Sequence, residues 1–126
     1  MPVILEDPSE KGYLLATYTG RISEDELLAS YRAFFDASGS TTEFRELCDL
    51  SDCDMSEITL DTLKQLSGLV REFCARNAIE VAKRACYVPR EINHSIMKLY
   101  SSASKESVEE TRVFSDREAA IRWLIE

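Results

Sequence analysis

Apolar positions along the chain recur with two periods, one typical of strands and the other typical of helices. Short runs rich in branched and aromatic residues are separated by stretches with apolar residues three and four positions apart. Polar or proline-containing segments interrupt the pattern between them. The short runs predict five strands, at Val3–Leu5, Tyr13–Tyr18, Phe44–Leu50, Ala82–Val88 and Thr111–Phe114.

The remaining apolar positions predict four helices. Ser23 and Glu26 form a capping box, in which the serine oxygen accepts a backbone N–H and the glutamate reaches back to the serine N–H. This helix should extend to about Ala37, the next should span Thr59–Arg76, and a second capping box at 115–118 should open the last. The apolar stripes are Leu27, Leu28, Tyr31, Phe34 and Phe35; Leu60, Leu63, Leu66, Val70, Phe73 and Cys74; Ile92, Ile96, Leu99, Tyr100 and Ala103; and Ala119, Ala120, Trp123 and Leu124.

The predicted order is ββαβαβαβα within one domain, residues 1–126. A turn at 7–12 makes the first two strands a hairpin, so the first strand should be antiparallel to the second. The other strands alternate with helices, which favours right-handed crossovers and an α/β fold with a mainly parallel five-stranded sheet. If the units advance in one direction, one sheet face needs cover from the last helix, another subunit or a ligand.

Two stretches of sequence and the long helix between them carry a family resemblance. They are the strand and turn at 46–51 (ELCDLS) and the closing segment at 112–124 (RVFSDREAAIRWL). Together with the element order, they resemble the SpoIIAA-like fold of STAS domains (sulfate transporter and anti-sigma-factor antagonist) and small bacterial SpoIIAA-like proteins of unassigned function. The resemblance implies a bacterial interaction module, expected to be a homodimer that binds a protein partner or a small apolar or anionic ligand.

In anti-sigma-factor antagonists, a D-S-S-G-like motif after the third strand carries a phosphorylatable serine. The matching region here, 54–59, reads DMSEIT and lacks the glycine. The resemblance therefore makes Ser51, Ser56 and Thr59 candidate phosphorylation sites. Nearby carboxylates would repel a phosphate there and oppose the gain from a helix N-terminus. A phosphorylation-controlled regulator is the first alternative function.

The net charge of −8 argues against a nucleic-acid binder that neutralises phosphates, and against docking on anionic lipid. No apolar run is long enough for insertion into a membrane, and the N-terminus lacks the pattern of a signal peptide, so we expect a cytoplasmic protein. The four cysteines fall mostly on apolar stripes, where reduced buried thiols are expected.

Candidate functional residues gather where the third and fourth strands end, the edge at which open α/β sheets bind ligands. They are Asp49, Ser51, Ser56, Arg90 and His94. As the only histidine, His94 would serve any acid–base chemistry near neutral pH, so a small enzyme pairing it with a loop carboxylate is a second alternative.

Other motifs predict no catalytic, cofactor or metal site. The acidic run at 49–61 fails as a calcium loop, because Glu57 replaces the turn glycine and Leu63 replaces the bidentate glutamate. Phosphate-binding, dinucleotide-binding and nucleophile-elbow motifs are missing from the sequence. We therefore expect a non-enzymatic protein without a cofactor.

Overall fold

The computed structural model describes residues 3–6, 11–38, 41–103 and 110–126. Its element order is the predicted ββαβαβαβα. The strands are β1 (Val3–Glu6), β2 (Leu14–Arg21), β3 (Glu43–Asp54), β4 (Val81–Tyr87) and β5 (Glu110–Phe114). The helices are α1 (Glu24–Ala37), α2 (Leu60–Arg76), α3 (Glu91–Ala103) and α4 (Arg117–Ile125).

The five strands form one mixed sheet in the order β1-β2-β3-β4-β5. Strand β1 is antiparallel to β2, and each later neighbour is parallel, as the hairpin and crossover arguments predict. The expected α/β fold with a mainly parallel five-stranded sheet is therefore confirmed. The turn at 7–12 lies mostly outside the described residues, although Gly12 has φ +79, a backbone conformation that favours glycine.

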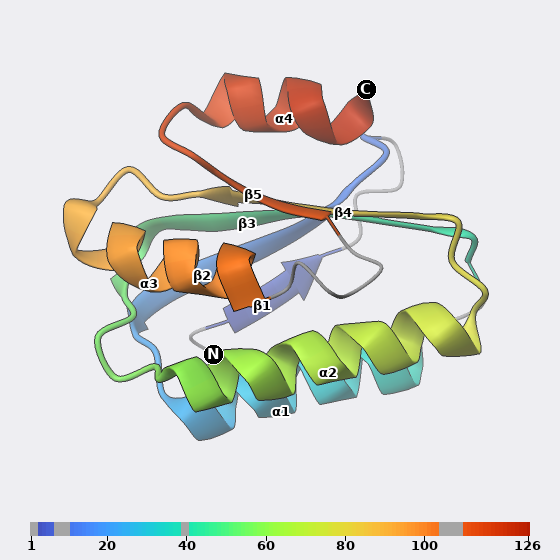
Figure 1. The fold of residues 1–126 in the computed structure, drawn as a ribbon, viewed down its shortest axis with the longest axis horizontal. Helices are drawn as coiled ribbons and strands as arrows, with labels where there is room; N and C mark the ends of the chain where they lie inside the picture. The colour runs from blue at the N-terminus through green and yellow to red at the C-terminus, as the bar shows by residue number, and fades with distance from the viewer. Residues whose placement is uncertain (1–2, 7–10, 39–40, 104–109) are drawn as a thin grey trace.

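Because the strands advance in one direction, right-handed crossovers place α1, α2 and α3 on one face of the sheet (Figure 1). Helix α4, which follows the last strand, lies on the other face. The last helix, one of the three covers considered, lies on the second face. Ala120 and Leu124 of α4 are buried against Leu47 and Ala85 of the central strands. Phe114, at the end of β5, packs on the same helix, with its ring centroid 5.8 Å from that of Trp123.

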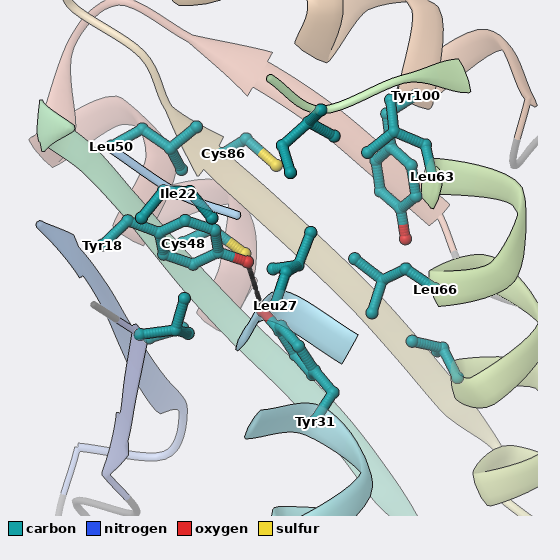
Figure 2. Packing of buried hydrophobic residues seen from close by; sticks show 14 of the residues in the cluster. Tyr18, Ile22, Leu27, Tyr31, Cys48, Leu50, Leu63, Leu66, Cys86 and Tyr100 are labelled. Carbon is teal, nitrogen blue, oxygen red and sulfur yellow. Dashed lines mark hydrogen bonds between the residues drawn. The ribbon is translucent and has the colours of Figure 1, made fainter. Parts of the chain in front are cut away.

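The main core lies between the sheet and α1–α3 (Figure 2). The aromatic stripe of α1 packs into it, as expected for core packing, with Tyr31 and Phe35 buried. Phe35 stacks on Phe73 of α2 at 4.4 Å between ring centroids, and Phe44 of β3 meets the Phe35 ring edge-on. These contacts join α1, α2 and the sheet.

The first capping box forms with one change from the predicted pattern. The Glu26 N–H donates to the Ser23 oxygen at 3.2 Å, whereas the Glu26 carboxylate accepts from the Ser23 hydroxyl at 2.9 Å. The second capping box is wrong, because Asp116 caps α4 by accepting from the N–H of Glu118 at 3.2 Å. The aspartate carboxylate lies one residue nearer the helix and reaches its free N–H groups first.

Two expectations about the middle of the chain are also wrong. Strand β3 continues to Asp54, past the predicted end at Leu50, and residues 52–54 pair with the end of β2. A register shift between Thr17 and Thr19 accommodates the extra length of β3. Leu60, placed by periodicity on the buried stripe of α2, is 39% exposed because it opens the helix beyond the edge of the core.

Helix α3 is rotated about its axis from the predicted orientation, so that part of its predicted apolar stripe faces solvent. Ile92 and Leu99 are 57% and 49% exposed, whereas Asn93, Met97 and Tyr100 are buried. The bonds of Asn93 to the backbone after β3, described below, explain this rotation, since they require its amide to point inward.

Candidate functional site

The carboxyl ends of β3 and β4 form the edge at which the predicted site residues were expected to meet. Asn93, which sequence reasoning missed, holds this edge together from the first turn of α3. Its amide donates to the Cys53 carbonyl at 2.9 Å and accepts from the Met55 N–H at 2.9 Å. Arg90 also donates to the Cys53 carbonyl, at 3.2 Å. The backbone that leads from β3 to α2 is therefore fixed to the start of α3.

Charged side chains surround this fixed backbone. Arg21, at the end of β2, lies 3.9 Å from Asp54 and 4.0 Å from Glu57. Hydrogen bonds from the hydroxyl and N–H of Ser56 lower the pKa of Asp54. Asp54 thus stays ionised at neutral pH and holds the turn that presents Ser56, whose side chain is exposed.

The predicted site residues separate between the two faces of the sheet. Asp49 lies on the α4 face, where its carboxylate accepts from the Ser51 N–H at 3.0 Å and lies 3.8 Å from Arg117. Arg90 and Ser56 belong to the opposite part of the edge, near α2 and α3. The structure therefore does not assemble the five candidates into one site.

The three candidate phosphorylation sites differ in what their hydroxyls do. Thr59 is the N-cap of α2, and its oxygen accepts from the Thr62 N–H at 3.2 Å. The Ser56 hydroxyl is hydrogen-bonded to Asp54, and Ser51 and Ser56 are exposed, as Thr59 is. Phosphorylation of these residues stays a prediction.

His94 is half-buried on α3. Among residues 3–6, 11–38, 41–103 and 110–126, no carboxylate forms an ion pair or hydrogen bond with its ring. The second alternative function needs such a contact, and the described part of the chain does not supply it.

A second polar cluster lies inside the core, where sequence reasoning placed none. Glu46 of β3 and Arg84 of β4 are register partners, and both are almost fully buried, at 0% and 1% exposure. The Arg84 guanidinium donates to one Glu46 carboxylate oxygen and to the Tyr100 hydroxyl, and its second NH₂ group donates to the Tyr31 hydroxyl at 3.2 Å. The other Glu46 oxygen accepts from Tyr31 at 2.6 Å.

The cluster extends to β2 through Tyr18, whose hydroxyl lies 2.7 Å from that of Tyr31 (Figure 2). Arg84 also lies 3.5 Å from the sulfur of Cys48. Burial raises the pKa of Tyr18, Tyr31 and Cys48 well above their ordinary values. Tyr18, Tyr31 and Cys48 are therefore neutral near pH 7, and they line the buried ion pair of Glu46 and Arg84.

Strand alternation could have located this cluster in the sequence. Glu46 shares the inward face of its strand with Phe44, Cys48 and Leu50. Arg84 alternates in the same way with Cys86 and Val88. Two opposite charges at inward positions of neighbouring strands indicate a buried pair, because an isolated buried charge is strongly disfavoured.

The described part of the chain contains no group of three or more metal-ligating His, Cys, Asp or Glu side chains. The four cysteines are buried thiols, as expected. Within the same residues, no helix is both long and apolar enough to cross a bilayer.

Comparison with known proteins supports the fold. No family model matches the sequence, and the curated proteins contain no match. A solved structure of an uncharacterized protein of the DUF3478 family, with a SpoIIAA-like fold, from Shewanella loihica PV-4 is similar to this chain at a TM-score of 0.55. The likeness covers 97% of this chain and 91% of that one at 15% sequence identity. The chain therefore has a SpoIIAA-like fold, which by itself fixes no function.

Proposed function

We propose that this protein is a non-enzymatic, STAS-like interaction module that docks a protein partner at the carboxyl edge between β3 and α2. The observation that carries the proposal is the double hydrogen bond of Asn93 to the Cys53 carbonyl and the Met55 N–H. These bonds hold an exposed segment in one conformation before a partner arrives, which reduces the entropy lost on binding.

The composition of the edge favours a protein over a small anion. Asp52, Glu57 and Leu60 of this segment are exposed, and Leu60 leaves 39% of its surface to solvent. The cations Arg21 and Arg90 at the same edge are engaged with Asp54 and Glu57 and with the Cys53 carbonyl. Exposed carboxylates repel an anionic ligand, whereas they attract a partner with basic side chains around an apolar contact. An apolar or anionic small ligand is therefore the weaker form of the hypothesis.

Site-specific photo-crosslinking in the native host tests this proposal. A photoreactive amino acid at Ser56 should give a discrete crosslinked protein, because this position lies within the proposed docking surface. The same probe at Glu72, an exposed position on α2 away from the edge, is the control. The double variant Asp52→Lys, Glu57→Lys should lose the Ser56 crosslink, because it inverts the charge that attracts the partner.

Two results would overturn the proposal. One is a crosslinking pattern at Ser56 that equals that of the Glu72 control. The other is a Ser56 adduct that survives the charge inversion unchanged, because docking would then not depend on the surface that we assign. A far-UV circular dichroism spectrum equal to that of the wild type checks that each variant is folded.

A further inference from the structure

The outward face of α3 carries a pattern that the core does not explain. Six of its side chains are exposed, and they fall at helical spacing on one side of the helix: Glu91, Ile92, Ser95, Lys98, Leu99 and Ser102. With 3.6 residues per turn they occupy an arc of about 120°. Ile92 and Leu99 are among the most exposed large apolar side chains of the described chain, at 57% and 49%.

This face, which we call the α3 stripe, is complementary to itself. Ile92 and Leu99 lie along one side of it, Glu91 and Lys98 lie along the other, and the short Ser95 lies between them. The midpoint of the apolar pair and the midpoint of the charged pair are one residue, about 1.5 Å, apart along the helix. A single register of two antiparallel α3 helices can therefore bring both the apolar pair and the charged pair into contact with their counterparts.

We propose that the α3 stripe docks against the α3 stripe of a second copy of this chain, with the two helices antiparallel about a twofold axis near Ser95. A twofold axis of this kind keeps each side of the stripe opposite the same side of its mate. Ile92 then packs on Leu99 of the partner subunit, and Glu91 meets Lys98 of the partner subunit, each pair occurring twice.

The charges select this arrangement over a parallel one. A twofold axis along parallel helices would instead set the charged side of one stripe against the apolar side of the other, so that Glu91 and Lys98 would face Ile92 and Leu99 of the partner subunit, and charges desolvated against apolar side chains are disfavoured. The stripe also carries no net charge within a chain whose net charge is −8, so two copies can approach on this face with less repulsion than elsewhere.

The expected dimer is weak. A single helix face lies at or below the low end of the areas that specific interfaces bury. Association should therefore depend on concentration and become visible between about 10 µM and about 1 mM. This surface shares no residue with the proposed docking edge of Asp52, Ser56, Glu57 and Leu60, so either proposal can fail without the other.

Sedimentation velocity of the whole chain over this concentration range tests the inference. The wild type should shift from monomer to dimer. Ile92→Asp should weaken the dimer more than about tenfold, since it introduces two desolvated charges at the contact. Ile125→Asp on α4 is the matched control, because Ile125 is 54% exposed on the other face of the sheet, and it should leave association unchanged.

Charge exchange tests the antiparallel register. Glu91→Lys alone and Lys98→Glu alone should each weaken self-association by about fivefold or more, since each homodimer then opposes like charges. An equimolar mixture of the two variants should recover association, because a basic stripe then faces an acidic one. The difference should shrink at high salt, where the Debye length falls to a few ångströms.

A wild type that stays monomeric at every concentration overturns the inference. So does a dimer that is indifferent to Ile92→Asp, or a mixture of the two charge variants that associates no better than either one alone. All four positions are exposed, so the variants should unfold near the wild-type temperature, and thermal melts establish that they are folded.

Discussion

Removal of one partner from the buried Glu46–Arg84 pair should destabilise the protein far more than removal of both. Arg84→Met leaves the Glu46 carboxylate buried with Tyr31 as its remaining donor. Glu46→Leu leaves a buried guanidinium without its carboxylate. Each single change should lower the free energy of unfolding by about 3–5 kcal/mol, a large fraction of the about 5–15 kcal/mol typical of a domain.

The double variant Glu46→Leu, Arg84→Met should lie within about 1–2 kcal/mol of the wild type. It removes both charges and fills the space with apolar side chains of similar length, and the Tyr18–Tyr31 hydrogen bond remains. The remaining deficit comes from two hydroxyls: Tyr100 loses the bond that Arg84 donates, and Tyr31 loses its bonds with Glu46 and Arg84. The coupling energy between the two sites should therefore be about 4 kcal/mol or more.

Urea unfolding at pH 7 measures all four proteins in one double-mutant cycle. Trp123, the only tryptophan, lies on α4 on the far side of the sheet, so its fluorescence reports unfolding without being altered by the substitutions. Far-UV circular dichroism should give the same midpoints. Additive effects of the two single changes, or a double variant less stable than either, would refute the view of this cluster as a buried ion pair.

Three further outcomes follow from particular contacts. Asn93→Leu should lower the free energy of unfolding by about 1–3 kcal/mol in urea titrations, because it removes the acceptor of the Met55 N–H and one of the two donors to the Cys53 carbonyl. Asn77→Leu, at the end of α2, is a milder control. Ser23→Ala should lower it by about 1 kcal/mol through loss of the cap, and an unchanged midpoint would contradict that bond. Since burial raises the pKa of Tyr18 and Tyr31, the unfolded state releases their protons first, and stability should fall as pH rises above about 10. Ultraviolet difference titration checks this, and normal ionisation of every tyrosine in the native state would contradict it.

Local signals in the sequence were sufficient for the order of elements. The strand-forming runs, the Ser23 cap and the amphipathic stripes each depend on neighbours within a few residues, so each is readable from the chain alone. The short link between the first two strands likewise determined that β1 is antiparallel, and alternation of strands and helices determined the parallel remainder.

The tertiary structure decided which side of each element faces the core. On α3 two apolar stripes compete, and the bonds of Asn93 to residues about forty positions earlier turn Met97 and Tyr100 inward and Ile92 outward. The tertiary structure also decided the sheet register that pairs Glu46 with Arg84, and this pairing offsets the free-energy cost of burying the two charges. The periodicity of one segment does not show which distant segment it will contact, because burial and hydrogen bonding between distant segments are decided only when the chain packs.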